Sequence, residues 1–238
     1  MSLVSPEFNA DHSFDDSWPV ETTRRMNRMY RRQRHIYDVT RRYYLLGRDQ
    51  MIARLQPEAG ARVLEIGCGT GRNLVAAAEL FPDARFFGID VSTEMLTSAI
   101  SALSRRGLAA RVRVAHADAT AFDPTALFQV AGFNAVMISY SLSMIPQWSR
   151  VLEAAAAHLK PGGRLHIVDF GQQEAWPGFA RALLRRWLEL FEVTPRDDLA
   201  QVLASLAARG GAALTFERPF RGYAQYAVLT MPSAQATP

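Results

Sequence analysis

The sequence of 238 residues is poor in the features that stabilise secreted proteins or anchor integral membrane proteins. Cys68 is the only cysteine, so an intrachain disulfide is excluded and nothing indicates an oxidising compartment. No run approaches the roughly 18 apolar residues of a membrane-spanning helix, and the N-terminus lacks the apolar core of a signal peptide. We therefore expect a cytoplasmic protein that is able to touch a membrane surface but not to cross it.

The sequence also lacks the spacing of several common catalytic sites. Its five histidines have no compact metal-ligand spacing, and the single cysteine adds no partner, so we expect no metal site. Ser139 and Ser141 are not surrounded by a nucleophile elbow, which disfavours their use as nucleophiles. No internal repeat or low-complexity stretch interrupts the chain, and 49% hydrophobic residues suffice for the core of one α/β domain.

Short apolar runs alternate with helix-like segments over most of the chain. Strands are expected at 61–66, 85–90, 111–116, 133–138 and 163–169, with helices at 72–80, 93–105 and 147–158 and a short helical segment near 124–130. Helices at 176–192 and 196–209 follow, and two final strands lie in ALTFERPF and GYAQYAVLTM. Strands that alternate with helices predict a mostly parallel sheet with helices on both faces and right-handed crossovers.

Composition divides the chain into four parts. Residues 1–20 are expected to be a flexible N-terminus, part of it an expression-vector remnant, and 233–238 a frayed tail. Residues 21–56 are expected to form a basic amphipathic helical region, and 57–232 a single α/β domain. Fold and function therefore depend on 21–232.

A glycine-rich segment, EIGCGTGRN at Glu65–Asn73, follows the first expected strand and opens the helix after it. Gly67, Gly69 and Gly71 can adopt positive φ and let a ligand approach the backbone, which a β-carbon would block. Their Gly-x-Gly-x-Gly spacing differs from the Gly-x-Gly-x-x-Gly of dinucleotide-binding folds. Asp90 ends the second strand, roughly where such folds place the acid that binds ribose. The two features predict a nucleotide-like ligand; the glycine loop by itself leaves a nicotinamide or flavin enzyme open.

Four motifs in sequence order resemble those of the class I S-adenosylmethionine-dependent methyltransferases. The first is the glycine segment, in which Glu65 precedes the glycines; HADATAF (116–122), AVMISYSLSMIPQW (135–148) and LKPGGRLHIVDFG (159–171) resemble the later motifs. The resemblance implies a Rossmann-like, seven-stranded, mostly parallel sheet whose last strand inserts antiparallel, and S-adenosylmethionine as the cofactor. It maps the residue that contacts the adenine amino group to Asp118. The residues expected around the cofactor are Glu65, Gly67, Cys68, Gly69, Gly71, Asn73, Asp90, Val91, Met95, Asp118, Ala119 and Ser139.

A basic segment precedes the first expected strand. Between Glu21 and Gln50, nine arginines stand against three acidic residues, a local net charge of +6, whereas the whole chain carries +4. Met26, Met29 and Tyr30 recur at helical spacing with arginines mostly on the other side, which predicts a basic amphipathic helix. Such a helix can lie on an anionic membrane, cover a ligand pocket, or bind nucleic-acid phosphates. The loop ISYSLSMIPQW lacks the Asn or Asp followed by Pro-Pro and an aromatic that marks nucleobase methyltransferases, so no nucleic-acid partner is expected.

A narrower resemblance extends from this basic segment into the glycine loop. Met29–Leu74, which includes IYDVTRRYYLLGRD, is similar to the bacterial methyltransferases that finish betaine-lipid synthesis, and RPFRGYAQYAV near the C-terminus continues the similarity. Those enzymes trimethylate the amino group of diacylglyceryl-homoserine. The resemblance implies the same reaction here, with an anionic membrane surface and its lipid as partners and a peripheral location on the inner face of the cell membrane. Phosphatidylethanolamine N-methylation, quinone C-methylation and a noncatalytic membrane-binding subunit remain as alternatives.

The acceptor side of the site follows from this chemistry. A neutral amine must be aligned with the methyl group and sulfur, and its proton must pass to a polar neighbour or water. Tyr37 and Tyr140 are the expected catalytic residues, since tyrosine rings also attract a methylated cation. An arginine fork suits the carboxylate of a homoserine headgroup. The residues expected to contact substrate are Arg41, Tyr44, Arg48, Tyr223 and Tyr226. Asp169, at the end of the fifth strand, either faces the pocket or caps a turn.

Overall fold

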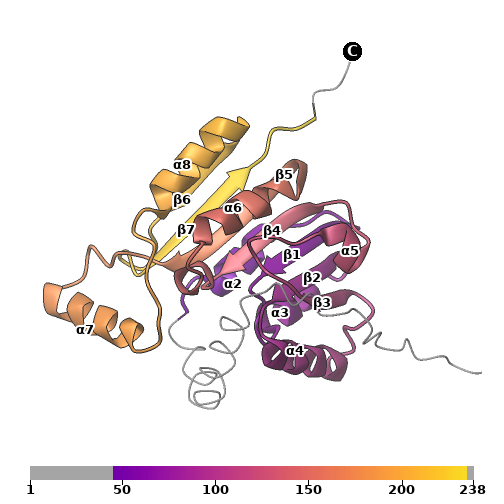
Figure 1. Ribbon diagram of the computed structural model, residues 1–238, viewed down its shortest axis with the longest axis horizontal. Helices are drawn as coiled ribbons and strands as arrows, with labels where there is room; N and C mark the ends of the chain where they lie inside the picture. Colours follow the sequence, from indigo (N-terminus) through magenta and orange to yellow (C-terminus); the bar gives the residue numbers. More distant parts are fainter. Residues whose placement is uncertain (1–44, 235–238) are drawn as a thin grey trace, which may run out of the picture.

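The structure is a computed structural model that describes residues 45–234 (Figure 1). One seven-stranded sheet runs through it, with the strand order β3-β2-β1-β4-β5-β7-β6. The strands are β1 (Arg62–Ile66), β2 (Arg85–Asp90), β3 (Val112–His116), β4 (Phe133–Ser139), β5 (Leu159–Phe170), β6 (Ala213–Glu217) and β7 (Ala224–Thr230). The pairs among β1 to β5 are parallel, and β7 runs antiparallel to both β5 and β6. The expected single α/β fold with an antiparallel last strand is confirmed.

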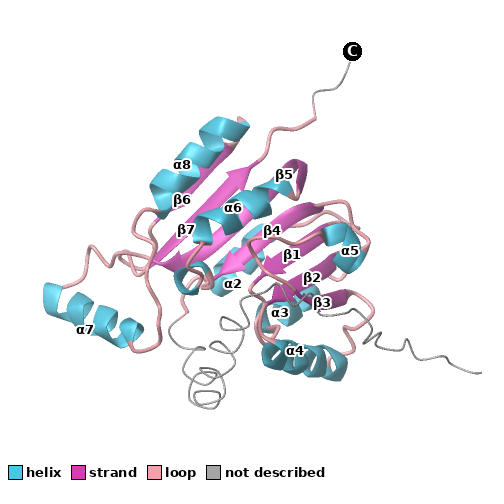
Figure 2. Cartoon of the chain, viewed as in Figure 1, coloured by secondary structure: helices cyan, strands magenta, loops and turns pink. Residues whose placement is uncertain are grey.

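Helices cover both faces of the sheet (Figure 2). They are α2 (Arg48–Leu55), α3 (Arg72–Leu80), α4 (Thr93–Arg105), α5 (Pro124–Phe128), α6 (Trp148–Ala157), α7 (Gly178–Glu189) and α8 (Leu199–Gly210), with a 3₁₀ turn η1 (Leu142–Met144). The core on one face includes Val63 of β1 with residues of α2, α3 and α4, whereas Leu64 lies in the opposite core with residues of α5, α6 and α8. Successive strand residues point to opposite faces, so both cores draw on the same strands.

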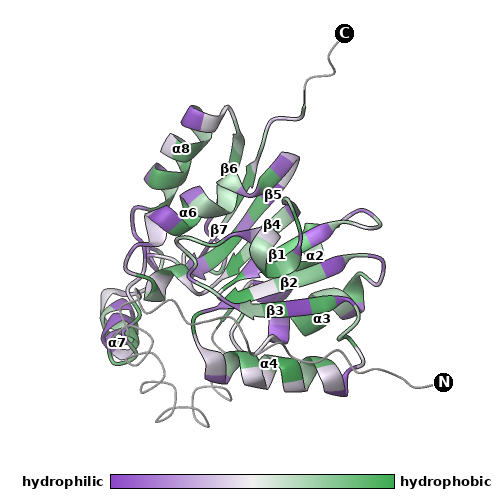
Figure 3. Ribbon diagram, turned by 45° about the vertical axis from the view of Figure 1, so that its right-hand side comes forward, coloured by the Kyte–Doolittle hydropathy of each residue, from purple (hydrophilic) through white to green (hydrophobic). Residues whose placement is uncertain are grey.

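The central strands are buried on both faces, which explains their nearly continuous apolar sequences. In β4, FNAVMIS, every residue except Asn134 is buried. Figure 3 shows hydrophobic colouring along the central strands and mixed colouring along α4 and α8, whose outer faces meet solvent. The sheet therefore forms a rigid support for the loops at the carboxyl ends of its parallel strands.

The clearest differences from the sequence expectation are at the ends of three elements. β5 begins at Leu159 because that residue already pairs with Phe133, before a register irregularity that precedes Arg164. α7 is shorter than 176–192, since it begins after Pro177 and Glu192, with a left-handed φ of 56°, lies beyond its end. α8 begins three residues later than expected.

Several expectations fall outside the described range. They are the flexible N-terminus at 1–20, residues 21–44 of the basic helical region, and the site residues Tyr37, Arg41 and Tyr44. The described end of the basic region contains α2, which follows Gly47 at φ 86°. In residues 45–234, no helix has both the length and the apolar character needed to cross a bilayer.

Candidate functional site

The turn between β1 and α3 is built by three glycines with positive φ. Gly67, Gly69 and Gly71 have φ of 72°, 53° and 75°, values that side chains rarely tolerate. A β-carbon on Gly67 would lie 2.6 Å from Cβ of Ser141, in the loop after β4. A β-carbon on Gly69 would meet no atom within 4 Å, although Gly69 lines a cavity. The turn thus packs tightly at Gly67 and leaves room for a ligand at Gly69.

Asp90, at the end of β2, ties the neighbouring loops together. One carboxylate oxygen accepts a hydrogen bond from Gly69 N at 2.7 Å, and the other accepts one from Ser92 N at 2.9 Å. Each carboxylate oxygen can accept a further bond, so the pair remains suited to the two hydroxyls of a ribose. Ser92 in turn caps α4, its Oγ accepting a bond from Met95 N at 3.3 Å. Met95 is buried at this first turn.

The loop after β3 lies at the same edge of the sheet, because β3 pairs with β2 in parallel. Oδ1 of Asp118 accepts a hydrogen bond from Thr120 N at 2.7 Å, and Asp118 also forms an isolated bridge with Ala121. Asp118 and Ala119 are partly buried. Val91, which follows Asp90, places its carbonyl 3.1 Å from Nε2 of His116. The loops that carry the expected ribose and adenine acids are therefore adjacent and internally braced.

A cavity of about 300 Å³ lies beside the glycine turn. Its lining is Leu45, Arg48, Glu65, Gly67, Cys68, Gly69, Thr70, Arg72, Asn73 and Ser139. Asn73 donates to Oε1 of Glu65 at 2.7 Å, while Asn73 Oδ1 and Ser139 Oγ are buried without a hydrogen-bond partner among the described residues. Buried polar atoms are usually satisfied, so these two indicate a polar ligand or water in the cavity.

The charges in the cavity suit an amino acid group. Glu65 is 1% exposed and Arg48 is 8% exposed, so both ionic side chains are held away from solvent. A buried carboxylate attracts an ammonium and a buried guanidinium attracts a carboxylate, which are the two charges of a methionine moiety. The residues present therefore fit S-adenosylmethionine, with Arg48 and Glu65 at its amino acid end and Asp90 and Asp118 at its nucleoside end.

Tyr140, expected to be catalytic, directly follows β4 and has a strained conformation. Its φ is 54°, unusual for a bulky residue, and its side chain is 1% exposed. The hydroxyl donates a hydrogen bond to the main-chain oxygen of Leu46 at 2.6 Å. Burial raises the pKa of the Tyr140 phenol well above its ordinary value. The phenol is thus protonated near neutral pH, which suits a positioning donor and disfavours a general base.

Cys68 lies between the glycines of the turn, and its backbone N–H donates to Ile89 O at 3.0 Å. Burial, followed by the charges of Asp90 and Glu65, raises the pKa of the Cys68 thiol well above its ordinary value. A protonated, buried thiol is a poor nucleophile. The backbone of Cys68 therefore shapes the turn, and its side chain fills space.

Asp169 supports the substrate-facing loop after β4. It is fully buried, and its carboxylate accepts hydrogen bonds from Ser143 N at 3.2 Å and Phe170 N at 2.7 Å. Arg196 donates to the carbonyls of Leu142 and Ile145 in the same loop, at 3.0 and 2.9 Å. Of the two roles that the sequence left open for Asp169, the structure supports the anchoring of a turn.

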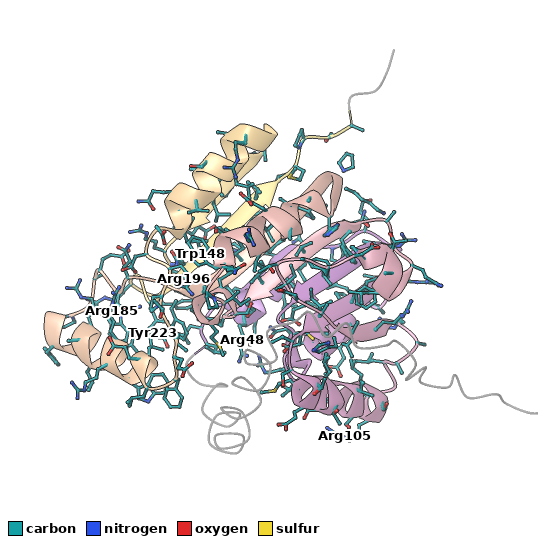
Figure 4. All side chains as sticks on the ribbon, in the orientation of Figure 1. Arg48, Arg105, Trp148, Arg185, Arg196 and Tyr223 are labelled. Atoms are coloured by element: carbon teal, nitrogen blue, oxygen red, sulfur yellow. The ribbon has the colours of Figure 1, made fainter. Side chains whose placement is uncertain are left out.

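A row of mostly buried aromatic rings runs from Tyr140, the neighbour in sequence of the cavity-lining Ser139, toward α7. The ring centroid of Tyr140 lies 4.7 Å from that of Phe170, which lies 6.0 Å from that of Tyr223. Tyr223 in turn lies 5.6 Å from Trp176, just before α7. Tyr223 is 4% exposed, and Figure 4 places its label between α7 and Arg48. The structure thus brings two of the predicted tyrosines, Tyr140 and Tyr223, into one row.

Tyr226 occupies a different position. Its hydroxyl lies 3.0 Å from Nδ1 of His166, and the guanidinium of Arg54 lies 4.8 Å from its ring centroid. Arg54 is six residues beyond Arg48 on α2, about 9 Å along the helix at 1.5 Å per residue. Tyr226 is not among the residues that line the cavity. The structure therefore separates it from Arg48, with which the sequence analysis had grouped it.

Sequence reasoning missed Leu45, Thr70 and Arg72 in the cavity wall and the Leu46 carbonyl that receives the Tyr140 hydroxyl. Thr70 and Arg72 lie inside the quoted glycine motif, so their position was available as a signal. Nothing in the sequence pairs Leu46 with Tyr140. In the part of the chain that the structure describes, no three His, Cys, Asp or Glu side chains are grouped as a metal site.

Several known methyltransferases are similar to this chain. Residues 63–163 match the family model described as a methyltransferase domain. The trans-aconitate 2-methyltransferase of Azoarcus sp. (strain BH72) is 35% identical over 117 residues, which cover 49% of this chain and 42% of that protein. The demethylmenaquinone methyltransferase of Clavibacter sepedonicus is 31% identical over 179 residues, which cover 72% of this chain and 66% of that protein. The chain therefore spans less than two thirds of the length of either relative.

A solved structure shows the same fold. Phosphoethanolamine N-methyltransferase 2 of Haemonchus contortus, determined with S-adenosyl-L-methionine, aligns with a TM-score of 0.61 at 18% identity, covering 80% of this chain and 53% of that chain. The sheet order, the glycine turn and the family match agree on the cofactor, S-adenosylmethionine. This chain therefore carries a class I S-adenosylmethionine-dependent methyltransferase domain.

Proposed function

We propose that this protein is a methyltransferase that trimethylates the amino group of diacylglyceryl-homoserine at the inner surface of the cell membrane. The observation that carries the proposal is the aromatic row from Tyr140 through Phe170 and Tyr223 to Trp176. Aromatic faces attract quaternary ammonium groups by about 0.5–2 kcal/mol each. An acceptor that becomes more cationic with each methylation gains from this attraction wherever it reaches an aromatic face.

Different residues of the cavity and its loops suit the two ends of the cofactor. When bound, S-adenosylmethionine supplies a methyl group on a sulfonium. Asp90 and Asp118 would hold its nucleoside end, and Arg48 with Glu65 would hold its amino acid end. Alignment of donor and acceptor supplies much of the rate in such a transfer.

The amine proton must leave before the nitrogen attacks. Tyr140 is protonated and already donates to Leu46 O, so it holds the strand end in place while another acceptor takes the proton. Water is such an acceptor, and Tyr37 stays a prediction because it lies outside the described residues.

The membrane setting has separate support. The segment Met29–Leu74, which resembles betaine-lipid methyltransferases, overlaps the basic segment Glu21–Gln50, whose local net charge is +6. Each arginine near an anionic bilayer contributes about 1 kcal/mol to the free energy of membrane binding. A peripheral protein with these two features suits an acceptor anchored by acyl chains.

A quinone is the second candidate acceptor. The demethylmenaquinone methyltransferase of Clavibacter sepedonicus matches 72% of this chain, the larger of the two coverages given above. A quinone ring also stacks on aromatic side chains, so the row alone does not separate a planar ring from a cation.

One experiment compares the acceptors. Purified full-length protein with S-adenosylmethionine is offered diacylglyceryl-homoserine, phosphatidylethanolamine and demethylmenaquinone in matched detergent micelles, and products are followed by mass spectrometry. We expect mono-, di- and trimethyl forms of diacylglyceryl-homoserine. Methylation of phosphatidylethanolamine or of the quinone in place of that lipid would overturn the proposal in favour of the corresponding enzyme. Binding to vesicles without measurable binding of S-adenosylmethionine would favour a noncatalytic membrane-binding subunit.

A further inference from the structure

α7 carries an apolar face that points away from the rest of the molecule. Phe179, Leu183 and Leu190 are 80%, 71% and 71% exposed, the highest values among the exposed large hydrophobic side chains of residues 45–234. Phe179 and Leu183 are four residues apart and Leu190 follows seven later, so all three lie on one side of the helix and its C-terminal end. We call these three residues the α7 stripe.

The opposite side of α7 holds the helix to the body. Leu188 is 2% exposed in the core, and Leu184 and Trp187 pack against that core as partly buried side chains. The Trp187 ring also contacts that of Phe191, with centroids 4.9 Å apart. Figure 1 shows α7 set apart from the other helices, at the side of the sheet. The stripe therefore lies on the side of α7 that faces away from these contacts.

Cationic side chains accompany the stripe. α7 contains three arginines and one glutamate. Arg185 is paired with Asp197 at 3.0 Å, whereas Arg181 and Arg186 are exposed. Arg186 is three residues beyond Leu183 and four before Leu190, so it lies within the line of the stripe. Arg181 is two residues from both Phe179 and Leu183, so it lies on the other side of the helix. An apolar face with an exposed arginine in its line matches the surface of an anionic bilayer, in which acyl chains lie below phosphate groups.

The stripe is continuous with the candidate active site. Trp176 lies three residues before Phe179, and its ring contacts Tyr223 of the aromatic row. The row continues to Tyr140, beside Ser139 of the cavity wall. A bilayer that contacts the stripe would therefore present headgroups near the start of the row.

We propose that the α7 stripe docks on an anionic lipid bilayer, where Phe179, Leu183 and Leu190 enter the acyl boundary and Arg186 contacts a phosphate. This membrane contact is distinct from the arginine-rich segment before residue 45. It deepens the proposed function, on which it rests only for the identity of the lipid acceptor.

The test measures sedimentation of full-length protein with vesicles of equal phosphatidylglycerol and phosphatidylcholine, which contain no methyl acceptor. We expect Phe179→Gln combined with Leu183→Gln to lower the partition constant at least about tenfold, because each side chain loses its transfer into an apolar phase. The matched control is Leu80→Gln combined with Ile100→Gln, which changes side chains that are 53% and 42% exposed on other helices. Its partition constant should stay within about twofold of the wild type.

Two results would overturn the docking proposal. One is equal vesicle binding by the α7 variant and the control. The other is an effect without lipid, either a lower unfolding temperature or a loss of self-association in the α7 variant, which would assign the stripe to residues 1–44 or to a second copy. Methylation of diacylglyceryl-homoserine in micelles is measured in parallel. Failure of that reaction with intact vesicle binding would remove the proposed function and leave the docking surface in place.

Discussion

The hydroxyl of Tyr140 donates a hydrogen bond to the main-chain oxygen of Leu46, 94 positions earlier in the chain, at 2.6 Å. The bond joins the end of β4 to the segment that leads into α2. Arg48 lies two residues beyond Leu46 and lines the cavity. The bond thereby anchors the segment that carries Arg48 of the cavity wall.

Tyr140→Phe removes this bond and keeps the ring. We expect a loss of about 1 kcal/mol in the free energy of unfolding and a several-fold weaker affinity for S-adenosylmethionine, since the Arg48 segment loses an anchor. The pH dependence of methyl transfer should not change, because the phenol is protonated in the wild type. Thermal unfolding, calorimetric titration and a pH–rate profile measure the three effects. A profile that loses a basic limb would contradict the positioning role.

Gly67→Ala should abolish cofactor binding, whereas Gly60→Ala should not. Both glycines have nearly the same φ, 72° and 74°, so both substitutions carry a similar left-handed strain of about 1–2 kcal/mol. Only at Gly67 does the new β-carbon meet another residue, 2.6 Å from Cβ of Ser141. Unfolding temperature and S-adenosylmethionine affinity are compared for the two variants. Equal behaviour would mean that backbone strain alone governs the turn.

Arg48→Met and Asp90→Asn should separate the two ends of the cofactor. Arg48→Met is expected to weaken S-adenosylmethionine by about tenfold to a hundredfold while leaving 5′-methylthioadenosine, which lacks the amino acid, nearly unaffected. Asp90→Asn should weaken both ligands, because both carry the ribose. Calorimetric titration of the two ligands gives the result, with the exposed Asp83→Asn as the control. Equal loss of both ligands in Arg48→Met would argue against its place at the amino acid end.

Two buried groups on β5 should give opposite pH dependences of stability. Burial, with the nearby charges of Arg164 and Arg54, lowers the pKa of His166 to about 4. The free energy of unfolding therefore decreases as the pH falls from 6.5 toward 4. Burial raises the pKa of Asp169 to about 6. The free energy of unfolding therefore decreases as the pH rises from about 4 through 6. Between pH 4 and 6.5 the two effects oppose each other.

Single substitutions should expose each effect. As the pH falls from 6.5 to 4, the stability of His166→Gln should rise by about 3 kcal/mol relative to that of the wild type. The stability of Asp169→Asn should fall by about as much relative to the wild type over the same change in pH. Urea unfolding at several pH values measures both differences. Parallel curves for the two variants would show that these groups do not titrate as their burial implies.

The strands and the glycine turn were predictable because their signals are local. Apolar runs at 61–66 and 85–90 differ by at most one residue from β1 and β2, and positive φ follows from glycine itself. The anchoring role of Asp169 was not predictable, since it depends on Ser143, 26 residues away in sequence. The role of Arg48 was not predictable either, because its positive charge alone suits the carboxylate of a substrate and the carboxylate of a cofactor equally well. Only the fold places it beside Glu65.

The antiparallel β7 has a consequence for synthesis on the ribosome. Residues 224–230 pair with β5 on one side and β6 on the other, and they lie near the end of the chain. Until they emerge, β5 is an open edge whose buried apolar side chains and free backbone groups invite pairing with other nascent chains. A ribosome that stops before Ala224 would release a chain whose sheet ends at that edge. The last strand therefore protects the protein from aggregation as well as completing its sheet.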